Sequence, residues 1–559
     1  MRFIIVTTLL GLGGAPPAAS PAEEGIPITS AAVRAACEPC HKADEQGRLT
    51  RISYRRTTPE GWQLTLRRMA SLNGAPLEPG PAREILRDLS NQLGLAPEEA
   101  RPATFEAERR LIDHSYTDKD TAEACARCHS MGRVIAQRRT REEWELVVAM
   151  HRGYYPLSDF QAFRRMGPPE TTPGPDGRPP DKRHPVEKAV DHLAQAFPLR
   201  TPEWAAWSAN RRPPRLTGRW ALSGHQAGRG AIYGRFVVAA KPGSEDEFVT
   251  ESRWLEARSG ASVERSGQAI VYTGFQWRGR SFAGAARTNP LREVMFVERD
   301  QARMWGRVFS GAYDEIGLDV TLERLGDDPV VLGVWPTALR TGSAAQSVRL
   351  FGANFASDLA PTDIDFGRGV KVTRIASASA DSLALDVDVA ADAPVGARDV
   401  FVSGASRAAA AVVYAAVDAL EVTPGAGMAR IGGIQMPKQL QQFEAVASSY
   451  GQDGKAGTPD DLSLGVVDVA WGLEEYPATF DDDDARHVGT IDSTGLFTPG
   501  ADGPNPRRRG SRNNVGDVWV VATLPAESPL KPARPLRARA HLLVTVPLYV
   551  RWDQPEVNP

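Results

Sequence analysis

The chain has 559 residues, 42% of them hydrophobic and 24% charged, and its formal net charge is −3. At about 100 to 200 residues per domain, this length predicts roughly three to five domains. The weak net charge gives no electrostatic basis for nucleic-acid binding. The 43 prolines and 51 glycines favour many short elements joined by turns.

The first 22 residues predict a secretory signal peptide. Arg2 is followed by the apolar run FIIVTTLLGLGG and then by the small-residue stretch APPAASPA, with cleavage expected between Ala19 and Ala22. The apolar run is too short to span a bilayer, and no later stretch approaches the roughly 18 apolar residues of a spanning helix. We therefore expect an exported chain without stable membrane insertion.

All four cysteines of the chain lie in two copies of Cys-x-x-Cys-His, in AACEPCHK and ACARCHSM. This pattern is the attachment signal for c-type haem: two thiols bind the vinyl groups, and the following imidazole binds the iron. A four-thiolate zinc site and two redox disulfides are the alternatives. Neither explains the histidine after each pair. The predicted attachment cysteines are Cys37, Cys40, Cys125 and Cys128, with His41 and His129 as proximal ligands.

Residues 23–200 are predicted to form a helical dihaem cytochrome c domain, because apolar residues recur there at three- and four-residue spacing. The domain contains a repeat, RRTTPEGWQLTLRRM (55–69) and RRTREEWELVVAMH (138–151). Aligning Trp62 with Trp144 places Met69 opposite His151, each seven residues beyond its tryptophan and so near the same helix face. Met and His are the usual second axial ligands of such haems. We therefore expect the pairs His41/Met69 and His129/His151.

Several neighbouring residues compete for these roles. Met150 becomes the ligand if its helix is rotated by about 100°, and Met166 is a further candidate, whereas Met131 is too close to His129 to reach the other haem face. His114, His184 and His192 are more typical of structural or solvent-facing histidines. Haem propionates and surface charge at helix starts are equally consistent interpretations of the repeated arginines, Arg55, Arg56, Arg138 and Arg139.

After the proline-rich segment 167–185 and one further helix, the chain is predicted to be β-structured. Alternating runs such as AIYGRFVVAA, separated by glycine-rich turns, indicate antiparallel hairpins. The expected units are an antiparallel β-barrel (201–327) and two immunoglobulin-like β-sandwiches (328–417 and 418–559). The fold class is thus multidomain, with helices first and three antiparallel β domains after them.

These features together resemble the alpha subunit of quinohemoprotein amine dehydrogenase over essentially the whole mature chain. The resemblance rests on CEPCH, CARCH, the RRTTPEGW and RRTREEW repeat, LSGHQAGRGAIYGRFVV and the two trailing immunoglobulin-like units. It implies a periplasmic heterotrimer in which this dihaem subunit binds a β-propeller subunit and a small subunit carrying a cysteine tryptophylquinone. Primary amines are oxidised to aldehydes and ammonia at that quinone. Electrons then pass through the haems to a copper protein or a cytochrome c.

No cysteine is left on this chain to build such a quinone, so we expect the amine-oxidising site on another chain and no catalytic residue here. A free-standing dihaem peroxidase needs an open iron position, against which the two ligand pairs argue. A secreted dihaem electron carrier with surface-binding immunoglobulin-like modules is the main alternative. The acidic run Asp481–Asp484 fits either a solvated loop or a calcium site.

Overall fold

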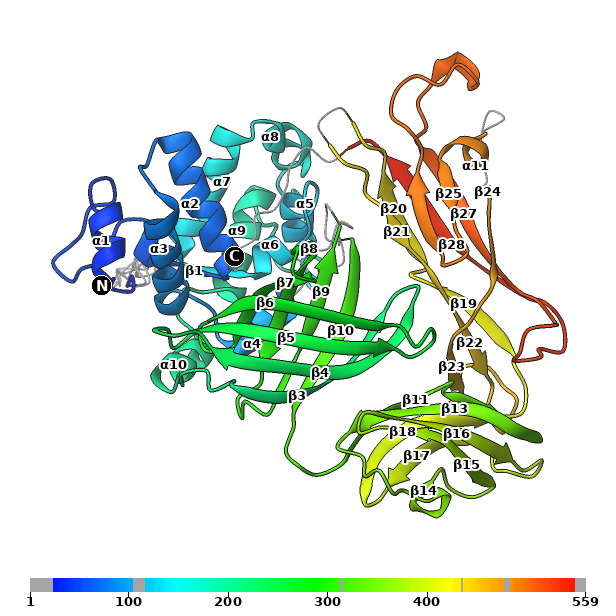
Figure 1. The fold of residues 1–559 in the computed structure, drawn as a ribbon. Coiled ribbons are helices and arrows are strands. Elements are labelled where there is room, and N and C mark those ends of the chain that lie inside the picture. The colour runs from blue at the N-terminus through cyan, green and yellow to red at the C-terminus, as the bar shows by residue number, and fades with distance from the viewer. Residues whose placement is uncertain (1–23, 104–115, 312–314, 434–435, 477–482, 548–559) are drawn as a thin grey trace, which may run out of the picture.

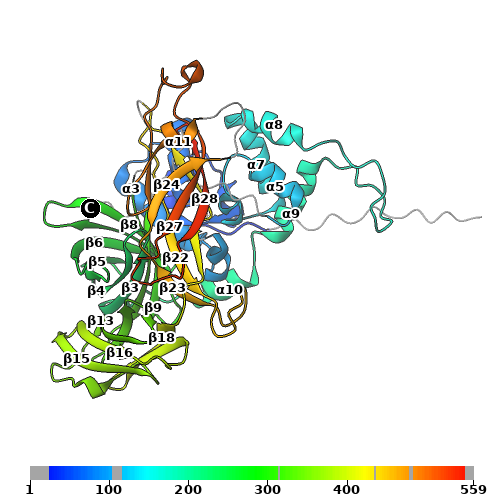
Figure 2. The same ribbon diagram turned by 90° about the vertical axis from the view of Figure 1, so that its right-hand side faces the viewer.

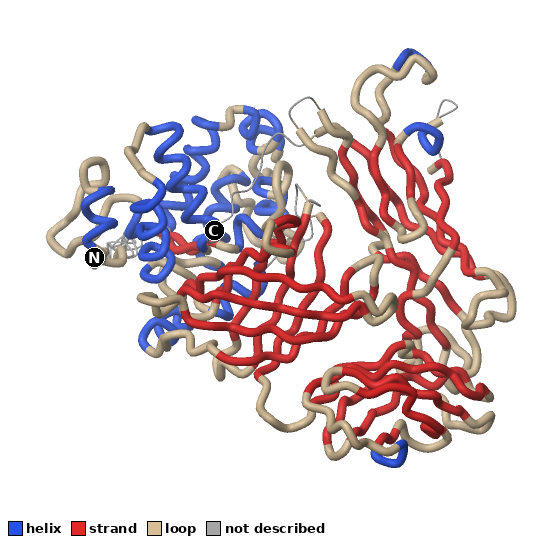
Figure 3. Tube along the Cα trace, viewed as in Figure 1, coloured by secondary structure: helices blue, strands red, loops and turns tan. Residues whose placement is uncertain are grey.

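The computed structural model describes residues 24–103, 116–311, 315–433, 436–476 and 483–547. The predicted signal peptide and His114 lie outside these residues. The helices gather in one unit, and the rest of the chain is almost entirely strands and loops (Figure 3). Three β units follow the helical unit (Figure 1). The predicted fold class, helices first and three β domains after them, is therefore confirmed.

The helical unit is built from short helices and one two-stranded sheet. Its helices are α1 (Ala31–Cys37), α2 (Pro59–Asn73), α3 (Pro79–Gln92), α4 (Pro97–Ala100), α5 (Lys119–Cys125), α6 (Gly132–Ile135), α7 (Arg141–Tyr154), α8 (Leu157–Gln161), α9 (Pro185–Ala196) and α10 (Pro202–Ala209). Its strands are β1 (Arg55–Thr57) and β2 (Gln137–Arg139). None of the helices that the structure describes combines the length and apolar character needed to cross a bilayer.

The helical unit is an internal duplication. Helices α2 and α7 begin in the same way, with the side chains of Thr58 and Thr140 accepting a hydrogen bond from the backbone N–H three residues on. Trp62 and Trp144 each lie four residues after these caps. The structure therefore aligns the same two tryptophans as the sequence does. Residues that lie 82 positions apart occupy equivalent places in the two halves.

Each half is closed by a third helix. The Trp62 indole donates to the Leu93 carbonyl at the end of α3, 3.0 Å away, and the Trp144 indole donates to the Phe197 carbonyl at the end of α9, 3.4 Å away. The backbone N–H groups of Thr57 and Arg139 donate to the same two carbonyls. Each tryptophan thus fixes its ligand-bearing helix to the helix that covers it.

The two halves meet through β1 and β2, which pair antiparallel. The register places Arg56 opposite Arg138, Arg55 opposite Arg139 and Thr57 opposite Gln137. Because residues 82 apart are equivalent, this pairing is symmetric about Arg56 and Arg138. A local twofold axis therefore passes between these two arginines, with one haem-binding half on each side.

The proline-rich segment 167–185 connects α8 to α9. Figure 2 shows the chain between these helices extending away from the helical unit. Proline removes backbone donors and fixes φ, so seven prolines in this stretch prevent both a helix and a central strand. The segment is a loop, as the sequence predicted.

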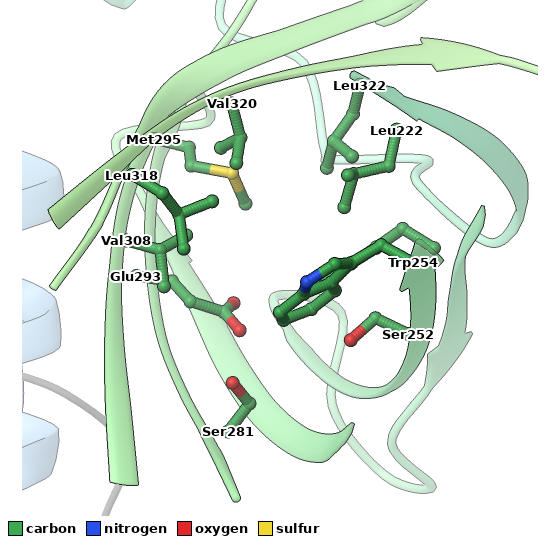
Figure 4. Close-up of a pocket in the computed structure, with 11 residues that line it drawn as sticks. Leu222, Ser252, Trp254, Ser281, Glu293, Met295, Val308, Leu318, Val320 and Leu322 are labelled. Carbon is green, nitrogen blue, oxygen red and sulfur yellow. The ribbon is translucent and has the colours of Figure 1, made fainter. Parts of the chain in front are cut away.

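The second unit is a closed antiparallel barrel of eight strands. They are β3 (Gly218–Gln226), β4 (Gly230–Ala240), β5 (Glu247–Glu256), β6 (Ser262–Tyr272), β7 (Gln276–Ala283), β8 (Thr288–Val297), β9 (Arg303–Ser310) and β10 (Ile316–Arg324). Inside the barrel, the Glu293 carboxylate points into a cavity beside Ser281, Ser252 and Trp254 (Figure 4). The cavity measures about 20 Å³, which is room for a water molecule but not for a cofactor.

The third unit is a sandwich of two four-stranded sheets, β11-β13-β16-β15 and β12-β18-β17-β14. The strands are β11 (Val330–Trp335), β12 (Ala338–Arg340), β13 (Ser343–Ala353), β14 (Ile364–Asp365), β15 (Val370–Ala378), β16 (Ser382–Val389), β17 (Gly396–Val402) and β18 (Ala405–Tyr414). The short β12 pairs with β18 in parallel, whereas the other pairs are antiparallel. The inward-facing residues of both sheets form one apolar core.

The fourth unit holds three small sheets, β19-β22-β23, β20-β28-β27-β24 and β21-β26-β25. The elements are β19 (Ala419–Thr423), β20 (Ala426–Arg430), β21 (Gln441–Gln442), β22 (Glu444–Ser449), β23 (Leu462–Val466), β24 (Ala470–Glu475), α11 (Asp484–His487), β25 (Gly489–Ile491), β26 (Leu496–Pro499), β27 (Gly516–Leu524) and β28 (Leu536–Thr545). Strand β20 pairs with β28 in parallel. The alternation of apolar and polar residues in a single strand predicts that it belongs to a sheet. It does not predict that β20 pairs in parallel with β28.

The barrel contacts each of the other units. Arg278 of β7 forms a buried ion pair with Glu60 of α2, with Nε and Oε1 2.5 Å apart. Tyr233 of β4 stacks on Phe351 of β13 at a centroid distance of 4.8 Å. His225 of β3 lies 2.8 Å from a carboxylate oxygen of Glu444 in β22. The helical unit is therefore fixed to the β scaffold at the first turn of α2.

The contact between His225 and Glu444 predicts a pH effect. The hydrogen bond to Glu444 raises the pKa of His225 above its ordinary value of 6.5. A raised histidine pKa stabilises the folded contact fully below pH 6.5, and this stabilisation is lost as the pH rises through the raised pKa. The Gly228 N–H donates to the same carboxylate. We expect its amide exchange, corrected for the intrinsic rate, to accelerate as the pH rises above 6.5, and His225→Gln to remove that dependence.

Candidate functional site

The two Cys-x-x-Cys-His motifs occupy equivalent turns at the ends of helices. Helix α1 ends at Cys37 and α5 ends at Cys125, and the caps Ser30 and Asp118 begin these helices in the same way. The His41 N–H donates to the Cys37 carbonyl at 2.8 Å, so the chain continues as a turn after the first cysteine. The exposed second cysteines, Cys40 and Cys128, lie within these turns. All four sulfurs are free thiols, as thioether formation requires.

Three histidines present the same nitrogen for metal binding. The Nδ1 atoms of His41, His129 and His151 lie 2.9, 2.9 and 2.8 Å from the carbonyl oxygens of Thr50, Ser130 and Val147. A carbonyl only accepts, so Nδ1 carries the proton in each neutral ring. Nε2 is then the atom with a free lone pair. This arrangement is the usual one for a histidine that binds a metal through Nε2.

The rings of His129 and His151 lie at a distance that suits two ligands of one iron. Their ring centroids are 6.4 Å apart, with the ring planes inclined at 42°. With a metal–nitrogen bond of about 2 Å and about 1.2 Å from nitrogen to ring centre, two imidazoles on one metal have centroids about 6.4 Å apart. The residues of the second half therefore fit a haem iron with two histidine ligands.

The environment of these rings keeps them neutral. Burial lowers the pKa of His129 to about 4, and burial also lowers the pKa of His151 below its ordinary value. A neutral imidazole is the form that binds a metal. Phe163 lies edge-on to His151 with a centroid distance of 6.4 Å, so the side of this site is apolar.

Met69 occupies the equivalent of His151 in the first half. It is half-buried on α2, one turn beyond the buried Leu66. Leu66 and Trp62 share an apolar core with Cys37. Met69 therefore lies on the face of α2 that packs toward the first attachment motif.

The alternative chemistries for the cysteines do not fit. Cys37 packs in one core and Cys125 in another, and no three His, Cys, Asp or Glu side chains gather as a metal site within the described ranges. Burial raises the pKa of Cys37 to about 11 and that of Cys125 to about 12. Reactive redox thiols have lowered pKa values instead.

The repeated arginines are buried, so the surface-charge interpretation is wrong. Arg56 forms two 2.7 Å contacts with Glu99, and Arg138 lies 3.2 Å from the same carboxylate. Arg139 pairs with Glu143 at 3.3 Å. Protein carboxylates thus satisfy three of the four arginines, and the propionate interpretation remains only for Arg55. The sequence patterns did not indicate Glu99, because it lies in neither copy of the repeat.

The remaining candidate ligands have structural positions. The His184 side chain caps α9, and His192 bonds to the Tyr116 hydroxyl at 2.9 Å. Met131 and Met166 are buried in apolar clusters. These four side chains are accounted for by local capping and packing.

In the acidic run, Asp483 and Asp484 pair with Arg508. Asp484 is buried, so a solvated loop is wrong for this residue, and the arginine takes the place that a cation would have. Asp481 and Asp482 lie outside the described residues.

Comparison with known proteins gives four family matches along the chain. Residues 28–167 match "Quinohemoprotein amine dehydrogenase A, alpha subunit, haem binding". Residues 213–325, 328–415 and 420–557 match domains II, III and IV of the quinohemoprotein amine dehydrogenase alpha subunit. The chain belongs to this family. Its haem-binding match contains both Cys-x-x-Cys-His motifs and both copies of the repeat.

Other comparisons add little about this alpha-subunit chain. No curated protein matches it. Among solved structures, the redesigned β-barrel mFAP1 bound to DFHBI is 14% identical, with a TM-score of 0.18, and the match covers 20% of this chain and 94% of that one. A de novo designed fluorescence-activating β-barrel is 16% identical, with a TM-score of 0.17, covering 20% and 96%. Scores this low carry no argument about function.

Proposed function

We propose that this chain is the dihaem electron-transfer subunit of a periplasmic quinohemoprotein amine dehydrogenase. Cys37, Cys40 and His41 hold the first haem with Met69 as second axial ligand. The second haem is held by Cys125, Cys128, His129 and His151. When bound, the haems supply one-electron redox centres. The chain's residues attach them, select their ligands and hold them on either side of the local twofold axis.

The observation that carries this proposal is the distance between two imidazoles. His129 follows an attachment motif, His151 comes from a separate helix, and their 6.4 Å separation suits one iron between them. Both rings have their Nδ1 proton engaged by a carbonyl. A peroxidase needs one open coordination position, which a bis-histidine site does not offer.

The amine-oxidising chemistry is proposed to lie on a partner chain. Both cysteine pairs are assigned to haem, so this chain has no thiol for a cysteine tryptophylquinone. The partners are then a small quinone-bearing subunit and a β-propeller subunit, with a copper protein or a cytochrome c as electron acceptor. The three β units serve as scaffold for them.

Purification of the native complex tests this assignment. An affinity tag on this chain, expressed in its own organism, is expected to co-purify two smaller chains together with a quinone absorbance, and addition of a primary amine is expected to reduce the haems. A chain that purifies alone and stays oxidised with amines contradicts the proposal. That outcome favours the secreted dihaem electron carrier.

Haem stoichiometry is a separate expected result. The wild-type chain is expected to give two covalent haems in a pyridine haemochrome assay. Cys125→Ala/Cys128→Ala should give one, and Cys37→Ala/Cys40→Ala is the matched variant for the other half. Because Cys37 and Cys125 pack against separate cores, loss of one haem should leave the other attached. Two haems retained in either double variant would contradict the attachment sites.

A further inference from the structure

Positive charge gathers where the two haem-binding halves meet. The charges of Arg51, Arg68 and Arg139 all act on Arg55, and those of Arg68 and Arg139 also act on His151. The one carboxylate that acts on Arg55 in this group is Glu143, and both of its oxygens are engaged: Oε1 lies 2.7 Å from Arg51 and Oε2 lies 3.3 Å from Arg139. Four guanidinium groups therefore share one carboxylate.

Arg55 is buried and forms no ion pair within the described residues. Its side chain is 9% exposed, and it donates from Nη1 to the Thr65 hydroxyl at 2.6 Å and from Nη2 to the Gly61 carbonyl at 3.3 Å. Its Nε atom is buried and has no hydrogen-bond partner in the described part of the chain. A guanidinium that is buried without a counter-ion is strongly unfavourable, so an anion beside Arg55 would stabilise it.

The position of α2 that the Arg55 side chain contacts, Gly61, carries no carboxylate. Position 61 is equivalent to position 143, so Gly61 stands where the second half carries Glu143. A Cβ at Gly61 would lie 2.2 Å from the Thr57 hydroxyl, so this position has no room for a side chain. The first half therefore provides only a backbone carbonyl where the second provides an anion.

Arg68 adds a second cation on the same helix, α2. It precedes Met69, is half-buried, and has no hydrogen bond or ion pair from its side chain within the residues described. Burial lowers the pKa of Arg68, and Tyr155 and Tyr154, at the end of α7, lie close enough to oppose this shift. The Tyr154 hydroxyl at the end of α7 lies 3.5 Å from Oδ1 of Asn73 at the end of α2, and the two helices are neighbours in Figure 1. Arg68 thus lies on the helix that carries Met69, close enough for its charge to act on His151 of α7.

We propose that Arg55 and Arg68 form an anion site that binds haem propionate carboxylates between the two halves. This inference rests on the proposed haem sites. Every c-type haem has two propionates, and a guanidinium fork matches a carboxylate. The site places positive charge beside the haems, where it favours the ferrous form because reduction removes one positive charge from the iron. Arg55 and Arg68 are therefore positioning residues that set potential.

Potentiometry of the full-length protein with both haems tests the site. In Arg55→Gln/Arg68→Gln, the equilibrium constant for reducing at least one haem is expected to fall about tenfold, which is about 59 mV for one electron. Arg67→Gln, one residue away and exposed to water, is the control and should leave both midpoints within a few-fold of wild type. Unchanged potentials in a double variant that retains two haems would overturn the inference.

Two further variants separate charge from packing. Arg55→Lys retains the charge without the fork and should restore most of the potential lost in Arg55→Gln; an equal fall in both variants would overturn the charge assignment. If Arg55→Gln loses haem or fails to fold, Arg68→Gln decides alone, because this half-buried side chain has no hydrogen bond to lose within the described residues. A fall in potential then supports the site, and no change overturns it.

Two further measurements identify the source of the anion and show separately whether the proposed haem sites exist. A chloride titration at constant ionic strength should leave wild-type midpoints unchanged. A chloride-dependent midpoint that disappears in Arg68→Gln would show that the site takes a solvent anion and would overturn the propionate assignment. Failure of the proposed haem sites appears separately, as fewer than two haems in the wild-type chain.

Discussion

Glu99→Gln is expected to destabilise the haem-binding unit by about 3–5 kcal/mol, the usual effect of removing one partner from a buried ion pair. Glu99 is the carboxylate that Arg56 and Arg138 share on the local twofold axis, and Arg56 is 0% exposed. Without it, two guanidinium groups stay buried and uncompensated. Urea unfolding of the full chain, followed by the Soret absorbance, measures this unit specifically.

The control is Glu98→Gln, a neighbour on the same short helix that is less buried, which should change the free energy of unfolding by no more than about 0.5 kcal/mol. Equal midpoints for the two variants would show that the arginine pair does not depend on Glu99.

Glu99 is also expected to make the stability of the fold depend on pH in the acidic range. Burial alone would raise the pKa of Glu99, but the hydrogen bond from Arg56 and the charges of Arg56 and Arg138 outweigh burial and hold the pKa below its ordinary value of 4.5. A lowered carboxyl pKa stabilises the fold above pH 4.5, and this stabilisation is lost as the pH falls through the lowered value. The wild type should therefore lose stability faster than Glu99→Gln on acidification below pH 4.5.

Exchange of the axial ligands is expected to have the largest spectroscopic effect. The wild type should show the methionine-to-iron charge-transfer band from one haem of two. Met69→His should abolish it, and His151→Met should double it. His151→Met should also raise the potential of its haem by on the order of 0.1 V, because a thioether favours reduced iron and axial ligands span roughly 0.8 V.

Met150→Leu and Met166→Leu are the controls for this experiment. Met150 is adjacent to His151 and Met166 is buried in a cluster with Val186 of α9, so both are methionines that the proposed scheme leaves uncoordinated. If Met69→Ala retained the band while either control lost it, Met69 would not be the ligand.

Local patterns in the sequence predicted much of the site. Cys-x-x-Cys-His identifies thiols and imidazole within five residues, and the helix caps and tryptophans mark equivalent positions over a single turn. The alignment of Trp62 with Trp144 is the structural alignment. The repeated Arg-Arg-Thr was less reliable, because Thr58 rather than Thr57 is the residue equivalent to Thr140.

Such patterns did not predict which carboxylate pairs with each buried arginine. Arg56 and Glu99 are 43 residues apart, and Arg278 and Glu60 are 218 apart. Nothing in the periodicity of either segment specifies which carboxylate a buried arginine meets. The same holds for β12 and β20, whose parallel pairing depends on partners more than about 70 residues later.

By itself, the sequence determined the two Cys-x-x-Cys-His motifs, the duplication and the succession of one helical and three β units, because these depend on spacing within a few helical turns or strands. The tertiary structure decided that β1 and β2 pair about Arg56 and Arg138, that the rings of His129 and His151 lie 6.4 Å apart, and that Arg55 is left without a carboxylate. Those features arise where two copies of one pattern pack together. Charge balance at such a junction depends on both copies at once, so neither copy specifies it alone.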